Sequence, residues 1–89
     1  MTIRQILADI HALEKELLDF EWKYGLRSET FFAGYTSGEE PDDDQWVLDF
    51  GEWASVYRTW LTRLADYRNA IRNIQSNAPS LSGLVQVAG

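Results

Sequence analysis

Apolar residues recur at alternating steps of three and four in two long segments, and this spacing limits the fold more than any other feature. The first set is Ile3, Ile6, Ile10, Leu13, Leu17, Phe20 and Tyr24. The second set is Trp46, Phe50, Trp53, Tyr57, Trp60, Leu64, Tyr67, Ile71 and Ile74. A heptad spacing places each set along one helix face and is typical of helices that pack side by side. We therefore predict an all-α protein built on two long helices.

Residues at both ends of the first segment favour a helix over about residues 2–24. Thr2 can cap its start through the side-chain hydroxyl. Gly25 stands where helices commonly end in a left-handed residue. Because no proline interrupts the segment, we expect one continuous helix.

The second segment predicts a helix over about residues 42–76. Pro41 suits a first-turn position, and the carboxylates that follow it suit the positive end of a helix dipole; they are Asp42, Asp43 and Asp44. Gly51 lowers the helix propensity by about 1 kcal/mol relative to alanine. We expect it either to allow a neighbouring element to approach closely or to mark a bend.

A shorter helix is expected between the two long ones, over about residues 28–36. Ser28 followed by Glu29 is typical of a capped helix start, and Ser37-Gly38 breaks the pattern. This helix has an aromatic face. We expect that face to pack over one end of the long pair, near Trp22, Trp46 or Phe50.

Two long helices joined through so short a segment should lie antiparallel. In the register that pairs Tyr24 with Phe50, Leu17 lies near Tyr57, and the larger aromatics of one helix face aliphatic residues of the other. The same register places Glu16 near Arg58.

Two helices do not enclose a core, so large aromatics along their seam would stay half exposed and lose burial free energy. We predict that another chain covers them, either a second copy that completes a four-helix bundle or a different protein. The predicted interface residues are Trp22, Phe31, Phe32, Trp46, Phe50, Trp53, Tyr57, Trp60, Leu64 and Tyr67.

Composition narrows the class of partner. The 14 acidic and 8 basic residues give a net charge of -6, which disfavours direct nucleic-acid binding because that binding depends on Lys and Arg neutralising phosphates. Half of the acidic residues lie between Glu39 and Glu52, which permits a basic partner but does not require one. The chain has no cysteine, no signal-peptide pattern and no membrane-spanning run, so we expect a cytoplasmic protein with no membrane partner.

The residues that commonly carry catalysis or bind metals form no recognisable site. His11 is the single histidine, and the acidic stretch lacks the spacing of a calcium loop. We therefore expect a non-enzymatic protein without cofactor or metal. One alternative is kept: Arg4 and His11 have a spacing similar to that of helical ribonuclease domains of the HEPN type, although Gln5 follows the arginine.

Residues 78–89 differ from the rest of the chain because they carry no charge and contain small residues, proline and glycine. We predict a single helical domain over residues 1–77 and a flexible tail over 78–89. The alternative is that the apolar residues of this tail dock against the domain or a partner.

The middle of the chain resembles a group of short prokaryotic helical proteins encoded beside toxin-like proteins. The resemblance covers roughly residues 13–64 and rests on Tyr24-Gly25, Ser28-Glu29, Phe31, Phe32, Tyr35, Gly38-Glu39-Glu40, Asp42-Asp43-Asp44, Trp53-Ala54-Ser55 and Tyr57. It implies an antitoxin-like role, in which a small acidic chain binds and blocks a basic ribonuclease-like protein. The alternative is a structural homodimer with no obligatory partner.

Overall fold

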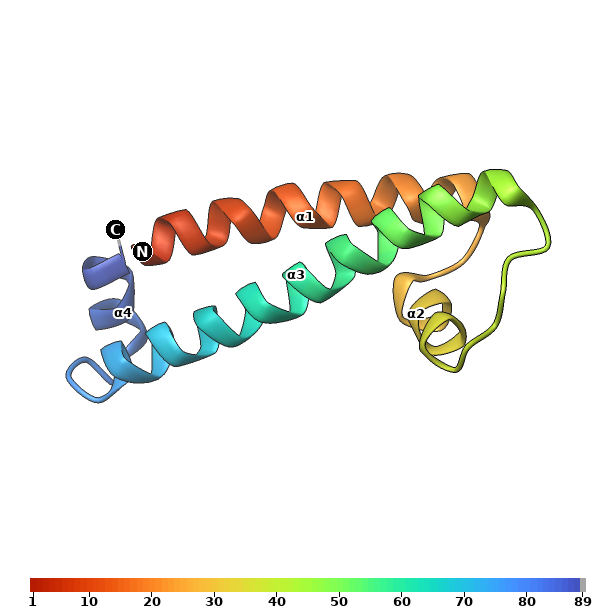
Figure 1. Cartoon of the computed structure of the whole chain (residues 1–89). Helices are drawn as coiled ribbons and strands as arrows, with labels where there is room; N and C mark the ends of the chain where they lie inside the picture. Colours follow the sequence, from red (N-terminus) through yellow and green to blue (C-terminus); the bar gives the residue numbers. More distant parts are fainter. Residues whose placement is uncertain (89) are drawn as a thin grey trace.

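Four helices make up the computed structural model, which describes residues 1–88 and contains no strand in that range (Figure 1). They are α1 (Ile3–Tyr24), α2 (Ser28–Thr36), α3 (Asp44–Gln75) and α4 (Leu81–Ala88). α1 and α3 form the long pair, α2 lies at the end where they are joined, and α4 lies at the opposite end. The all-α prediction and the three predicted helices are confirmed.

The caps of α1 follow directly from its terminal residues. The Thr2 hydroxyl accepts a hydrogen bond from the Gln5 amide at 3.2 Å, and the Gln5 side chain accepts one from the Thr2 amide at 2.8 Å. At the other end, Gly25 has a φ of 71°, and its amide donates to the Glu21 carbonyl at 2.8 Å. A left-handed residue of this kind favours glycine because it has no Cβ.

α3 begins two residues later than predicted, because Asp43 caps it. The Asp43 carboxylate accepts a hydrogen bond from the Gln45 amide at 2.9 Å, so Pro41 precedes the helix and is not in its first turn. Gly51 lies inside an unbroken helix, and a Cβ built on it would meet no atom within 4 Å. The close approach considered for this glycine is therefore absent.

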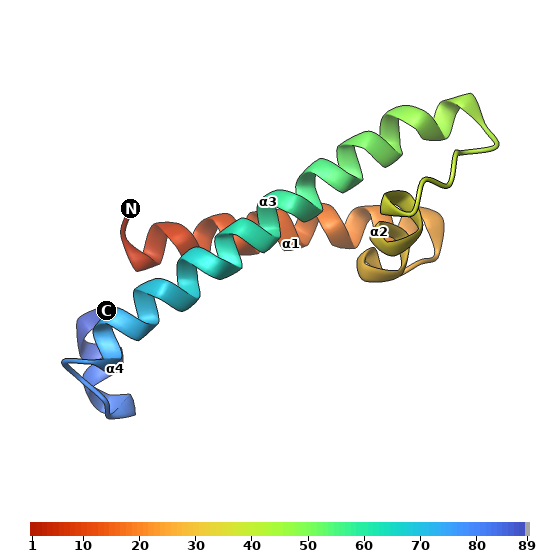
Figure 2. The same ribbon diagram turned by 60° about the horizontal axis from the view of Figure 1, so that its bottom comes forward.

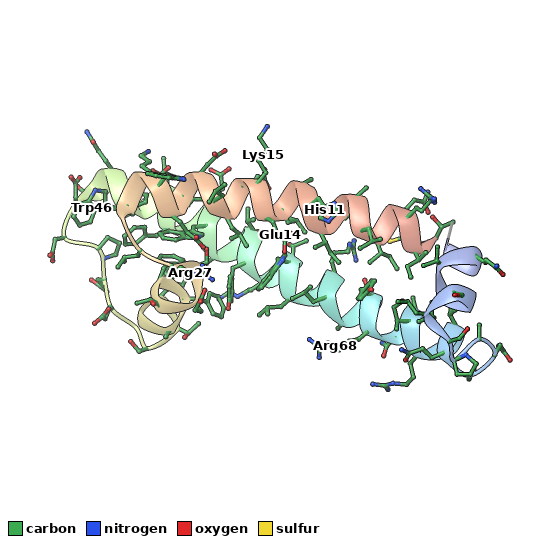
Figure 3. The ribbon with its side chains drawn as sticks, turned by 180° about the vertical axis from the view of Figure 1, so that it is seen from behind. His11, Glu14, Lys15, Arg27, Trp46 and Arg68 are labelled. Atoms are coloured by element: carbon green, nitrogen blue, oxygen red, sulfur yellow. The ribbon has the colours of Figure 1, made fainter. Side chains whose placement is uncertain are left out.

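The predicted antiparallel register is confirmed along the long pair. The rings of Tyr24 and Phe50 are 5.4 Å apart, and the Trp60 indole donates to the Glu14 carboxylate at 3.2 Å. Glu14 lies between the two helices in Figure 3, and Figure 2 shows that the helices cross at an angle. The predicted Glu16–Arg58 pair does not form, because the Arg58 guanidinium lies over the Phe32 ring, 5.4 Å from its centre.

The best-covered part of the core lies where α2 meets the long pair. Trp53 is 0% exposed and stacks on Phe31, with ring centres 3.9 Å apart and planes 3° from parallel. On its other side it stacks on Phe20 and Tyr24. Flat rings packed this closely bury a large apolar area.

A buried polar contact accompanies this packing. The Trp53 indole N–H donates to the Ser28 hydroxyl at 3.0 Å, and Ser28 is 2% exposed. The hydroxyl and the amide of Ser28 both donate to one Glu21 carboxylate oxygen, at 2.6 and 2.9 Å. Arg27, the residue before α2, makes no side-chain cap. Glu21 of α1 takes the place of that cap. Ser28 is the first residue of α2 and does not cap it.

The molecule is elongated, with extents of 52 × 22 × 20 Å. Its radius of gyration is 16.6 Å, against about 12 Å for a compact domain of this length. Beyond α2, the seam is covered only in part: Leu64, Tyr67 and Ile71 remain half-buried on α3.

The segment predicted to be a flexible tail contains α4, which packs against the end of α3. The Ser80 hydroxyl caps α4 by accepting from the Gly83 amide at 3.0 Å. Gly83 lies close to the preceding turn: a Cβ on it would be 3.0 Å from the Ala78 side chain, a tight contact. The mobility of residues 78–89 and the domain boundary at residue 77 stay predictions, and Gly89 lies outside the described residues.

Replacing Ser28 by alanine tests the buried polar contact. We expect Ser28→Ala to lower the free energy of unfolding by about 1–3 kcal/mol, because it leaves the buried Trp53 indole N–H without an acceptor. Urea denaturation followed by tryptophan fluorescence measures this change. The control Ser55→Ala removes an exposed serine from α3 and should change stability by less than about 0.5 kcal/mol. Equal effects of the two substitutions would contradict the role assigned to Ser28.

Candidate protein-interaction surface

The ten predicted interface residues fall into three groups by exposure. Trp53 and Phe31 are buried. Trp22 and Trp46 are exposed. The half-buried group comprises Phe32, Phe50, Tyr57, Trp60, Leu64 and Tyr67.

For Trp53 and Phe31 the interface prediction needs a correction. Both side chains are covered by their own chain, because α2 packs over the long pair and fills the space that a partner was predicted to fill. Trp53 is 0% exposed and Phe31 is 5% exposed, so in this structure they offer almost no surface to another protein. These two residues belong to the core of the chain itself.

The half-buried residues other than Phe50 follow one another along the long pair, and we call this row the ridge. The Phe32 and Tyr57 rings are 4.7 Å apart, and the Tyr57 and Trp60 rings are 5.5 Å apart. Leu64 and Tyr67 continue the same seam beyond α2. This ridge has apolar area left for a second chain, and its coverage by one stays a prediction.

Trp22 is the most unusual residue of the surface, because its large side chain is 80% exposed. Leu18 precedes it by one helical turn, and Leu26 follows the Gly25 turn; both are also exposed. The three line an open groove of about 570 Å³ whose other walls are Glu21, Gly25 and Arg27. We call Leu18, Trp22 and Leu26 the Trp22 patch.

Sequence reasoning named only one residue of the Trp22 patch as an interface residue. Leu18 was recognisable, because a residue four positions before Trp22 lies on the same helix face. Leu26 was not, because it lies beyond the helix and only the left-handed turn at Gly25 places it beside the groove.

A charged contact ties the ends of α1 and α3 together next to this surface. Asp49 accepts hydrogen bonds from the Lys23 ammonium at 2.6 Å and from the Tyr24 hydroxyl. These two donors hold the pKa of Asp49 below its ordinary value. Burial, followed by the contact with Asp49, raises the pKa of Tyr24.

An acidic segment borders a smaller cavity at the same end of the molecule. The exposed residues Glu39, Glu40 and Asp42 line it together with aromatic residues of α2 and α3, and its volume is about 250 Å³. Leu26 lines both this cavity and the groove of the Trp22 patch. The apolar groove and the acidic segment therefore form one continuous surface.

Arg4 and His11, the pair predicted for a ribonuclease, are both exposed on α1; His11 is labelled in Figure 3. Neither residue lines the groove of the Trp22 patch or the acidic cavity. Across residues 1–88, no three His, Asp or Glu side chains are grouped so that they could hold a metal ion. Over the same range, no helix has the length and apolar character that crossing a bilayer requires.

Comparisons with known proteins identify no relative of this chain. No model of a protein family matches the chain, and no curated protein and no solved structure matches it significantly. The antitoxin-like resemblance therefore stays a prediction.

Replacing Asp49 tests the charged contact between the helix ends. A carboxylate whose pKa is lowered by folding contributes stability that is present above its unfolded pKa of about 3.9 and is lost as the pH falls through the folded value. We therefore expect the free energy of unfolding of Asp49→Asn to fall less steeply below about pH 4 than that of the unmodified chain.

Chemical denaturation at a series of pH values measures this dependence. The control is Asp19→Asn, which removes an exposed carboxylate of α1 that makes no hydrogen bond with another described residue. A pH profile of Asp49→Asn that coincides with that of the control would show that the contact contributes nothing.

Proposed function

We propose that this chain is a non-enzymatic interaction module that binds a small basic protein, in an antitoxin-like role. The observation that carries this proposal is the Trp22 patch. An 80% exposed tryptophan flanked by two exposed leucines is costly in water and gains burial free energy when a partner covers it.

Tryptophan at the centre of such a patch is a typical interface anchor. It supplies a large, rigid contact area, and residues of this type carry a large share of binding free energy in many interfaces. The partner would place apolar side chains in the groove of about 570 Å³ beside Trp22. The apolar face of a partner helix is one way to cover such an exposed surface.

The charge of the chain supports a basic partner. The net charge is -6, and the exposed acidic segment lies next to the groove. Complementary charge speeds encounter and disfavours acidic competitors. The antitoxin-like part of the proposal rests on the resemblance of residues 13–64, and a cytoplasmic location belongs to the same proposal.

Replacing Trp22 tests the proposed function. The chain is co-expressed with the protein encoded by the adjacent gene, and co-purification and relief of toxicity are measured. We expect Trp22→Ala to weaken binding by about 2 kcal/mol or more, the loss typical of a central anchor residue. Its own stability should change little, because the side chain contacts mainly water.

The matched control is Leu81→Ala. Leu81 is 77% exposed on α4, at the opposite end of the molecule (Figure 1). The control should leave binding unchanged. Absence of co-purification together with absence of any relief of toxicity would refute the antitoxin-like role.

A structural homodimer is the second candidate function, favoured by the half-buried ridge that continues through Leu64 and Tyr67. Completion of a four-helix bundle would cover this seam. Light scattering at micromolar concentration tests it: a dimer has twice the chain mass of 10.3 kDa, and Tyr67→Glu should shift it to monomer. A monomeric unmodified chain would rule out the homodimer.

A further inference from the structure

We propose that the acidic cavity between α2 and the start of α3 binds an arginine side chain of the basic partner. This inference rests on the proposed function and names how the partner is recognised. The volume of about 250 Å³ lies below the range of about 300–1,000 Å³ typical of drug-sized ligands and suits a single side chain.

The aromatic residues that line the cavity form a continuous row. Tyr35 lies 5.5 Å from Phe31, Phe31 lies 5.1 Å from Phe50, and Phe50 lies 6.0 Å from Trp46, measured between ring centres. Trp46 and Tyr35 keep accessible area at the two ends of this row. The faces of Trp and Tyr attract cations, and the planar guanidinium of arginine also stacks on them.

Three carboxylates also line the cavity, and the chain itself does not neutralise them. Among the described residues, Glu39, Glu40 and Asp42 have no ion-pair or hydrogen-bond partner for their carboxylates. The neighbouring acids differ: Asp43 caps α3, and Asp49 is held by Lys23 and Tyr24. These three carboxylates are therefore available to form charge-assisted hydrogen bonds with a guanidinium at the cavity.

Gly34 allows one of these carboxylates to lie against α2. A Cβ built on Gly34 would be 2.7 Å from a Glu39 carboxylate oxygen. Gly34 has ordinary helical backbone geometry: among the described glycines, only Gly25 and Gly38 have a positive φ. Glycine therefore serves here because it has no side chain in the way of Glu39, and not because of its backbone freedom.

The cavity also lies where a partner on the Trp22 patch would reach it. Leu26 lines both the cavity and the apolar groove, and Trp46 stands at the end of the molecule beside the 37–43 connection (Figure 3). A partner segment with an apolar residue in the groove and an arginine nearby would contact both. Charge complementarity thus selects a basic partner for this surface.

An NMR titration of the full chain tests the inference. The probe is the capped pentapeptide acetyl-Gly-Ala-Arg-Ala-Gly-amide, compared with versions that carry citrulline or lysine in place of arginine. We expect the arginine peptide to cause saturable shifts of the Trp46 indole N–H and of the Gly34 and Tyr35 amides. Citrulline has nearly the same shape without the charge, so its peptide should cause none, and lysine should bind more weakly.

Gly34→Ala is the informative variant, because it displaces the Glu39 carboxylate without changing the net charge. The atom in its way is the end of a flexible side chain, so the fold should tolerate the change. We expect arginine-peptide affinity to fall by about three- to tenfold, as for the loss of one charge-assisted contact at an exposed site. The thermal midpoint should stay equal or rise, since alanine favours helix.

The control Asp44→Asn removes an adjacent charge that does not line the cavity, and it should leave the affinity nearly unchanged. Equal shifts with the citrulline peptide, no saturable shift with arginine, or unchanged affinity in Gly34→Ala would overturn the inference.

Failure of the inference and failure of the proposed function are distinguishable. Partner capture that depends on Trp22 but not on Gly34 would overturn the arginine site and leave the proposed function in place. Binding of the arginine peptide without any co-purifying basic protein would support the cavity and contradict the partner assignment.

Discussion

The stacking of Trp53 between α1 and α2 is the interaction on which the rest of the structure depends. One ring brings together three helices: it stacks on Phe20 and Tyr24 of α1 and on Phe31 of α2. Its indole N–H needs a buried acceptor, and Ser28 provides one while Glu21 holds Ser28 in place. Apolar packing and hydrogen bonding therefore fix α2 at the same point.

Because α2 covers one end of the long pair, it determines where apolar side chains remain exposed. α2 takes the space beside Trp53, and exposed apolar area remains elsewhere, for example on α1 at Leu18 and Trp22 and along the seam beyond Trp60. An elongated chain of this size has too little interior to hide all of its large side chains. The proposed interaction surface follows from that shortage, with the acidic cavity placed beside it by the turn that carries Leu26.

The sequence predicted the fold more fully than the candidate site. Heptad spacing, the Thr2 and Gly25 caps and the Tyr24–Phe50 register depend on local periodicity and chain direction, which are readable from residues. The burial of Trp53 and Phe31 could not be predicted from the sequence, because the residues of a helix face do not say which neighbour covers them. α4 was missed as well: it is short and contains Gly83, and its Ser80 cap gives only a weak signal.

The sequence alone determined that this protein is all-helical, acidic and built on an antiparallel pair, because periodicity and charge are properties of the chain itself. Only the tertiary structure decided which aromatics are core and which are surface, since exposure depends on the path of α2. It also brought Leu26 beside Trp22 and Glu39 beside Gly34. Gly25 and Gly38 turn the chain after α1 and α2. Which residues the chain meets after each turn depends on how the packed helices are placed.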